Sequence, residues 1–269
     1  MAEDIITVST RKGGVLKTSI CVNLAGALAY NGKKVLIIDM DSQSNVILSF
    51  GRNPDQLNAS LHDFLVKGYG LKFLNKSMIR VHENIDILPS NDDMLDFELD
   101  VIINKERYKK PFHLLKGIVD FVSNSYDYII IDTPPNFGLV QGNALLASKS
   151  VIVPFQPEKY SMRALIKIIE TIKGFKVEMN PGLRLACVVP TLVDMRTTLH
   201  SEVLKEVEKY CSEHDVHLTK TSIPKSIRYP SSITYENKPI TLSDTKSTFS
   251  RFYFNLLDEI YCNGGKVMV

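Results

Sequence analysis

Long apolar runs are absent from this sequence. No stretch approaches the roughly 18 consecutive apolar residues that a membrane-spanning helix needs. The first ten residues, MAEDIITVST, are acidic where a secretory signal peptide would be basic. We therefore expect a soluble, cytoplasmic protein that does not act at a membrane.

Cysteine is scarce, and neither sign of charge is in excess. The four cysteines, Cys21, Cys187, Cys211 and Cys262, have no paired spacing, so the sequence indicates neither a disulfide framework nor a zinc site. There are 32 lysines and arginines against 30 aspartates and glutamates, which leaves a net charge of +2. Any contact with nucleic acid must therefore come from a local basic patch, because no general basic field exists.

Linkers and repeats are also missing. The chain has 269 residues, of which 44% are hydrophobic and 23% charged, which is ordinary for a globular protein. No low-complexity tract or Pro/Gly/Ser-rich segment divides it, so we expect residues 1–269 to form a single domain. Residues 52–112 are more polar and less regular. They predict helices and a loop packed on one side, and no function can be assigned to them.

What the sequence does contain is an alternation of short apolar runs with longer helical patterns. The runs are Ile5–Val8, Lys34–Ile38, Ile85–Leu88, Tyr128–Ile131, Ser150–Val153 and Leu185–Val189. Most end at an aspartate or before a proline, and they are apolar on both faces, which is typical of buried parallel strands. The pattern predicts an α/β fold with a doubly wound, mostly parallel sheet and helices on both faces.

Three unusual loops follow predicted strands, where ligands of such sheets bind. They are STRKGGVLKTS (Ser9–Ser19), DMDSQSN (Asp39–Asn45) and DTPPNFG (Asp132–Gly138). The first has the order of a phosphate loop: strand, glycines, Lys-Thr, then a helix whose N-terminal amides attract anions. The usual G-x-x-x-x-G-K-S/T pattern, however, would need glycines where this chain has Arg11 and Leu16.

Residues 12–18, KGGVLKT, resemble the deviant loop K-G-G-x-G-K-S/T of the ParA/MinD group of ATPases, and only Leu16 departs from it. VLIIDMDSQSN is similar to that group's strand ending in D-x-D-x-Q-x-N, and YDYIIIDTPPNFG to Y-D-x-I-I-I-D-x-P-P-x-x-G. SIPKSIRYPSSITYENKPI resembles the I-P-x-x-x-R segment and G-K-P-I end of ParA/Soj partition proteins. The resemblance covers nearly the whole chain and implies a P-loop NTPase-like fold that binds ATP with Mg²⁺ and hydrolyses ATP.

The resemblance also implies roles for single residues. The residues that would bind the nucleotide are Lys12, Gly13, Gly14, Val15, Leu16, Lys17, Thr18 and Ser19. Lys17 would hold the β- and γ-phosphates, and Thr18, Asp39 and Asp132 would hold Mg²⁺. Asp41 would orient the attacking water. The alternative for the carboxylates is that they cap the following helices, and this stays open above all for Asp39.

Lys12 has a separate implied role. In this family the early lysine reaches the nucleotide of a partner, which adds Lys12 to the residues that take part in catalysis. The implied catalytic residues are therefore Lys12, Lys17 and Asp41. ATP would then promote a sandwich homodimer that hydrolysis releases. A solvated surface lysine is the alternative.

Basic residues near the C-terminus match positions at which partition proteins bind DNA without sequence preference. They are Arg196, Lys225, Arg228 and Lys238. Such phosphate contacts are salt-sensitive and carry no base information; ordinary solvated side chains are the alternative. The resemblance thus implies an enzyme of plasmid or chromosome partition, associated with the nucleoid and stimulated by a ParB-like centromere-binding protein.

Three other classes compete with this interpretation. A MinD-like membrane ATPase would end in an amphipathic basic helix, whereas the helix predicted over residues 249–261 carries side chains suited to core packing: Phe252, Leu256, Leu257 and Ile260. A carrier related to the nitrogenase iron protein would need paired cysteines, and no cysteine lies in the DTPP loop or in the helical stretch directly after it. A nucleotide-binding module that does not hydrolyse ATP is the third alternative.

That third alternative depends on Leu16. If the backbone at this position takes a positive φ, leucine costs on the order of 1–3 kcal/mol of strain. If φ is helical, it costs little. We expect a tolerated substitution, because the N–H of residue 16 is retained and several phosphate contacts outweigh strain of that size.

Overall fold

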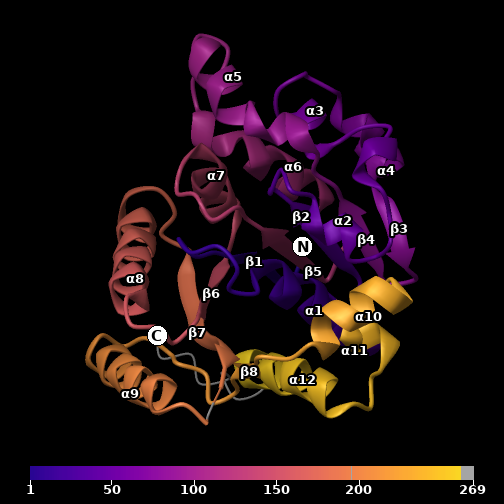
Figure 1. Ribbon diagram of the computed structural model, residues 1–269. Helices are drawn as coiled ribbons and strands as arrows, with labels where there is room; N and C mark the ends of the chain where they lie inside the picture. The colour runs from indigo at the N-terminus through magenta and orange to yellow at the C-terminus, as the bar shows by residue number, and fades with distance from the viewer. Residues whose placement is uncertain (195, 262–269) are drawn as a thin grey trace.

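The computed structural model describes residues 1–194 and 196–261 (Figure 1). Its centre is an eight-stranded sheet with the order β3-β4-β2-β5-β1-β6-β7-β8. The strands are β1 (Asp4–Val8), β2 (Val35–Asp39), β3 (Ile79–His82), β4 (Ile85–Leu88), β5 (Tyr128–Asp132), β6 (Ser150–Phe155), β7 (Arg184–Val193) and β8 (Ile223–Pro224). β3 runs antiparallel to β4, and the other neighbouring pairs are parallel.

Helices connect the strands and cover both faces of the sheet. The α-helices are α1 (Lys17–Tyr30), α2 (Asn45–Leu48), α3 (Leu61–Leu65), α4 (Leu74–Ser77), α5 (Phe97–Ile103), α6 (Leu114–Val122), α7 (Leu139–Ala147), α8 (Ser161–Glu178), α9 (Thr198–Glu213), α10 (Arg228–Glu236), α11 (Ile240–Ser243) and α12 (Thr248–Tyr261). Short 3₁₀ helices are η1 (Pro54–Gln56), η2 (Leu71–Phe73), η3 (Asp92–Leu95) and η4 (Pro111–His113).

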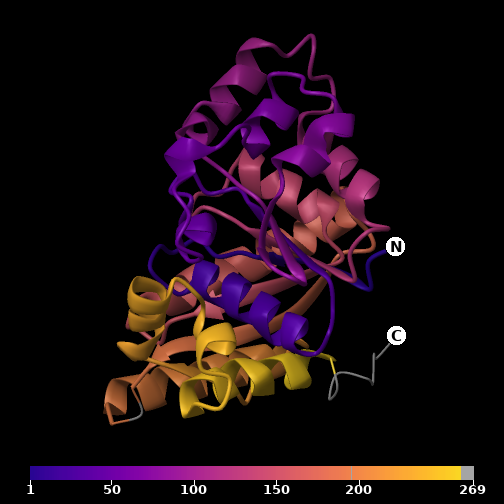
Figure 2. The same cartoon turned by 90° about the vertical axis from the view of Figure 1, so that its right-hand side faces the viewer.

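Successive strand residues point to opposite faces, which divides the core into layers. In β2, Val35 and Ile37 join the apolar cluster under α1 and α12, whereas Leu36 and Ile38 join the cluster under α3, α5 and α6. A third cluster packs α8 and α9 against β6 and β7. Figure 2 shows the sheet edge-on between α1 with the C-terminal helices and the magenta helices of residues 52–147. The predicted doubly wound sheet is confirmed.

The predicted strands are present, with two differences in length. The prediction that strands stop before Pro154 and Pro190 is wrong, because β6 and β7 continue through both prolines. Pairing of β6 with β1 ends at Ile152, so the N–H that Pro154 lacks falls beyond that ladder. The helices predicted after the phosphate loop and at the C-terminus are confirmed as α1 and α12.

The polar segment 52–112 forms short helices, as expected, together with β3 and β4 at one end of the sheet. Most of its buried apolar residues pack on the α6 face in the second cluster, whereas Ile85 and Ile87 of β4 join the first cluster. The apolar pattern did not predict β3, a short edge strand that is only partly buried. No helix of the described chain is both long and apolar enough to span a bilayer. The tail after Tyr261, including Cys262, lies outside the described residues.

Candidate nucleotide-binding site

Strand register brings the three predicted loops to one place. Asp132 at the end of β5 is the register partner of Val8 in β1 on one side and of Asp39 in β2 on the other. Because these strands are parallel, the loops that follow them leave from the same edge of the sheet. The segments 9–16, 40–44 and 133–138 therefore lie next to one another.

The phosphate loop joins β1 to the N-terminus of α1. Gly14 has a φ of 71°, in the left-handed region that glycine adopts without strain. Among the described residues, no side chain caps the N-terminus of α1. The first-turn N–H groups of Lys17, Thr18 and Ser19 are thus available to an anion, at the positive end of the helix dipole.

Leu16 adopts the strained conformation. Its φ is 66° and its ψ is 28°, directly before α1 begins. A left-handed backbone costs a residue with a side chain about 1–2 kcal/mol. The leucine side chain packs against the cluster beneath α1, which partly offsets that cost. A left-handed turn, which glycine makes without strain, is therefore made here with leucine.

Lys17 is buried at the start of α1, with 7% of its surface exposed. Its Nζ donates to the carbonyl oxygen of Lys12 over 3.3 Å. Burial lowers the pKa of this ammonium, and the nearby carboxylates of Asp132 and Asp41 act in the opposite direction. The structure thus brings the predicted residues Lys17, Asp41 and Asp132 together around one buried cation.

Thr18 and Asp132 form the direct contact between the phosphate loop and β5. The Thr18 hydroxyl donates to Oδ2 of Asp132 over 2.5 Å. Oδ1 of Asp132 is buried and has no hydrogen-bond partner within the described residues. Burial raises the pKa of Asp132 to about 6, although Thr18 and Lys17 favour its charged form. A hydroxyl beside a carboxylate with an unused oxygen is the hard-oxygen donor set that Mg²⁺ takes.

Asp39 and Asp41 organise the loop after β2. Oδ1 of Asp39 accepts from the N–H of Asp41 over 3.0 Å, and Oδ2 accepts from the N–H of Val46 in α2 over 3.2 Å. Burial raises the pKa of Asp39, and the neighbouring Asp132 adds to that rise. Asp41 is half-buried, and its Oδ1 accepts from the N–H of Gln43. Both oxygens of Asp39 thus hold the backbone that carries Asp41, and the predicted metal role of Asp39 remains a prediction.

Lys12 is held by side chains that follow β6. Its Nζ lies 3.1 Å from Oε1 of Gln156 and 2.5 Å from Oε2 of Glu158. One third of the Lys12 side chain is exposed. Next to it, the Arg11 guanidinium lies 4.9 Å from the centre of the Phe137 ring in the loop after β5. The sequence motifs predicted no role for Gln156, Glu158 or Phe137.

The predicted DNA-binding residues lie at the other end of the same sheet edge. Val193 of β7 pairs with Pro224 of β8, so the segments that carry Arg196 and Lys225 both follow these paired strands. The Arg196 side chain is 90% exposed and forms two hydrogen bonds to the Asp194 carboxylate.

The other two basic residues flank α10. Arg228 is its first residue and contacts Asp244 over 3.2 Å. Lys238 follows its last turn, and Lys225, Arg228 and Lys238 are all exposed. Arg196 and Lys225 therefore follow neighbouring strands, whereas Arg228 and Lys238 lie at opposite ends of α10, whose place is marked in Figure 1.

The sheet, the glycine loop at an uncapped helix and the Thr18 hydroxyl between buried Lys17 and Asp132 define the class: a P-loop-type nucleotide-binding protein. A family model of the AAA domain matches residues 3–185. A ParA family protein of Mycoplasma pneumoniae is 35% identical over 266 residues, covering 95% of this chain and 96% of the relative. The sporulation initiation inhibitor protein Soj of Bacillus subtilis is 34% identical over 260 residues, covering 97% and 99%. The chain belongs to the ParA/Soj family of partition ATPases.

Solved structures with the same fold include nucleotide complexes. Cobyrinic acid a,c-diamide synthase from Mycobacterium smegmatis, with bound ADP and magnesium, is 27% identical with a TM-score of 0.81, covering 99% of this chain and 96% of that one. A Borrelia burgdorferi protein assigned to plasmid partition, bound to AMPPNP, is 25% identical with a TM-score of 0.77, covering 97% and 99%. Proteins similar to this chain thus bind adenine nucleotides, in one case with magnesium.

Proposed function

We propose that this protein is an ATP-driven DNA-partition enzyme that works as a single domain. ATP and Mg²⁺ bind at the loop after β1, two protomers close on the nucleotides, and the dimer binds DNA without sequence preference. Hydrolysis, stimulated by a ParB-like centromere-binding protein, releases the DNA. The enzyme would act in the cytoplasm on the nucleoid.

One observation carries the nucleotide part of this proposal: Lys17, Thr18 and Asp132 are gathered at the uncapped N-terminus of α1, with the ammonium and the carboxylate buried. Such charged groups, one of them with an unused oxygen, are costly to bury without ligands. A triphosphate would satisfy Lys17 and the α1 amides. Mg²⁺ would bind Thr18 and Asp132 and neutralise developing charge on the phosphates. Asp41 would orient the attacking water, and Asp39 would fix the loop that carries Asp41.

The dimer part rests on Lys12. Its ion pair with Glu158 is at the surface, where such pairs contribute about 0–1 kcal/mol. Moving Nζ from Glu158 to a phosphate of the facing protomer therefore costs little. The exposed basic residues Arg196, Lys225 and Arg228 would then each be presented twice in one dimer, which strengthens contact with the DNA backbone.

Sedimentation velocity with AMPPNP and Mg²⁺ tests this proposal. We expect a dimer for the wild type and a monomer for Lys17→Ala, which should also lose nucleotide binding in calorimetry. Lys12→Ala should retain nucleotide binding but remain monomeric. Lys33→Ala is the matched control, because Lys33 is also a partly exposed lysine paired with a glutamate, Glu3, but is remote from the loop. A wild type that binds AMPPNP and stays monomeric would contradict the dimer part.

Leu16 favours one second candidate, a nucleotide-binding module with impaired turnover. Its φ of 66° strains the turn that must hold the phosphates. Steady-state ATPase assays with DNA separate the two candidates, with Asp41→Ala as the baseline. Turnover above that baseline supports the enzyme; turnover equal to it, with nucleotide binding intact, supports the module.

A further inference from the structure

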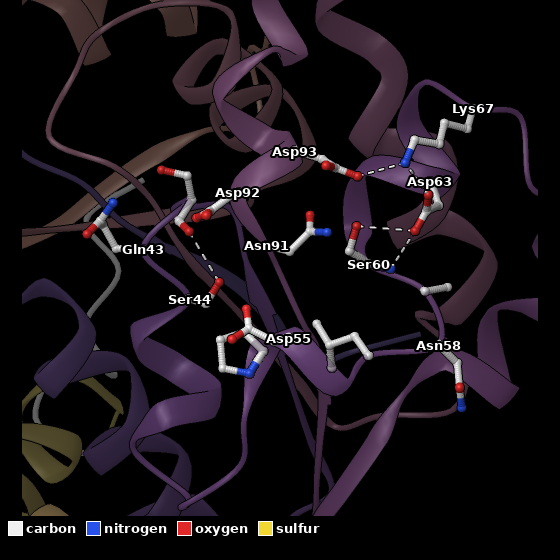
Figure 3. Close-up of a pocket in the computed structure, with 14 residues that line it drawn as sticks. Gln43, Ser44, Asp55, Asn58, Ser60, Asp63, Lys67, Asn91, Asp92 and Asp93 are labelled. Atoms are coloured by element: carbon white, nitrogen blue, oxygen red, sulfur yellow. Dashed lines mark hydrogen bonds and ion pairs between the residues drawn. The ribbon is translucent and has the colours of Figure 1, made fainter.

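A second cluster of ligand-type side chains lies apart from the phosphate loop. α3 carries His62 and Asp63, and η3 carries Asp93; one ligand atom from each lies within 4.8 Å of the others. Asp63 and Asp93 line a polar cavity of about 320 Å³ (Figure 3). The opposite wall of that cavity is residues 42–44, in the loop that follows Asp41. The proposed function uses none of the cluster residues.

His62 has the hydrogen-bond pattern of a metal-binding histidine. The residue is 3% exposed, and its Nε2 lies 3.0 Å from Oδ2 of Asp100. A carboxylate only accepts hydrogen bonds, so Nε2 carries the proton of the neutral ring and Nδ1 presents a lone pair. Nδ1 is buried and has no hydrogen-bond partner in the described part of the chain. Histidine ligands of metals commonly donate their second ring N–H to a carboxylate in this way.

The two carboxylates already bind a cation, the ammonium of Lys67. Its Nζ lies 3.0 Å from Oδ1 of Asp63 and 2.7 Å from Oδ2 of Asp93. Figure 3 shows Lys67 reaching this pair from the rim of the cavity. Oδ2 of Asp63 is held by the N–H of Ser60, so its other oxygen is fixed toward the cation. The Lys67 side chain is 48% exposed and can exchange its two carboxylate contacts for water.

We propose that His62, Asp63 and Asp93 form a binding site for a divalent transition-metal ion such as Zn²⁺ or Co²⁺, and that Lys67 is the resident cation with which the metal competes. One imidazole and two carboxylates suit these ions, and water from the cavity completes the coordination. Binding would fix α3 to η3 beside residues 42–44. The site does not depend on nucleotide.

The test is titration of the full-length, nucleotide-free protein with Co²⁺, followed by its visible d–d absorption, and with Zn²⁺ in calorimetry. Millimolar Mg²⁺ is present to occupy Thr18 and Asp132. The wild type should bind one Co²⁺, and the d–d bands of the bound ion should show that one of its ligands is a nitrogen atom. Lys67→Met should bind it at least about tenfold more tightly, because the competing cation is gone. Asp100→Asn should weaken binding by about 10- to 100-fold, as loss of a carboxylate behind a ligating histidine does.

Ligand variants and a neighbour control separate this site from surface binding. His62→Gln should abolish the nitrogen-dependent bands, and Asp93→Asn, whose side chain is 43% exposed, should abolish tight binding without unfolding. Asp92→Asn is the matched control, because Asp92 lines the same cavity without belonging to the cluster. The proposal is overturned if the wild type takes up no Co²⁺ at millimolar concentration, or if its spectrum is the same in His62→Gln and Asp93→Asn. Neither result would bear on nucleotide binding, which is measured separately.

Discussion

Two regions at the same edge of the sheet differ in whether their charged side chains are buried or exposed. After β1, β2 and β5, the charged groups Lys17, Asp39 and Asp132 are at most 7% exposed. After β7 and β8, the Arg196 side chain is 90% exposed, and Lys225 is also exposed. In the first region burial lowers the pKa of the lysine and raises the pKa of both aspartates, which favours the neutral form of each group. In the second, the charges stay in water.

The difference separates charged groups whose burial costs folding energy from charged groups whose exposure costs none. Burying a charge is costly unless it is fully paired, so the first region stores an unfavourable energy that a bound ligand would relieve. The exposed region stores none, and changes to its residues should have at most a slight effect on folding. Stability measurements without ligand therefore distinguish the two regions.

The largest effect is expected at Asp132, as a pH dependence. The pKa of its carboxyl is about 6 in the folded protein and about 4 in the unfolded chain. At pH values between these two, the folded state therefore keeps a proton that the unfolded state has lost. Stability from this group is therefore lost as pH rises from about 4 to 6, by about 3 kcal/mol in total. Asp132→Asn should remove that loss, so its advantage over the wild type in urea unfolding should grow from pH 4 to pH 7.

Asp194 supplies the control with the opposite sign. Its pKa is lowered by Arg196, so its contribution to stability is present at neutral pH and fades as pH falls through the acid range. Asp194→Asn should thus be slightly less stable than the wild type at pH 7 and equal to it at low pH. Parallel pH profiles for the two variants would contradict the contrast between the regions.

A smaller effect is expected at Leu16. With φ at 66°, glycine should be more stable than alanine at this position by about 1 kcal/mol, because only glycine adopts this conformation without strain. Leu16→Gly and Leu16→Ala both remove the leucine packing, so their difference in unfolding free energy isolates the backbone term. In an ordinary helical position the order reverses. Ala164→Gly in α8 should be destabilising by about 1 kcal/mol. If Leu16→Ala is the more stable variant, the left-handed turn is not strained.

Much of the fold was predictable because it depends on local pattern. Buried parallel strands are apolar at successive positions, and this identified every strand from β1 to β7 except β3. β3 escaped because it is a partly buried edge strand whose Arg80 pairs with Asp86 of β4, which is not an apolar pattern. The strand ends predicted at prolines were wrong. A proline interrupts a strand only where its missing N–H would have bonded to a neighbouring strand, and local sequence does not specify that neighbour.

The candidate site was predictable as far as residue identity, but its contacts were not. Thr18 and Asp132 could be paired from sequence because both follow strands of one sheet and match motifs of one family. Glu158, which holds Lys12, lies 146 residues away in sequence. His62 and Asp100 belong to a segment without any motif, and only the packing of α3 and α5 onto the sheet brings them together. Contacts of this kind are set by tertiary structure alone.

The smallest effect on folding is expected in the exposed region, where the effect on DNA binding should be the largest. Lys225→Ala should leave the unfolding midpoint unchanged, and Arg196→Ala should lower it no more than Asp194→Asn does, because both side chains are in water. In the nucleotide-bound state, each should weaken binding to random-sequence duplexes equally and lower the slope of log K against log salt by about 1 for each DNA phosphate that is no longer neutralised. Fluorescence anisotropy at several salt concentrations measures this. Lys209→Ala is the control, because Lys209 is also an exposed lysine but lies on α9. An unchanged salt slope in both variants, or the same fall in Lys209→Ala, would mean that these charges are only solvated, and the two regions would then differ in burial but not in function.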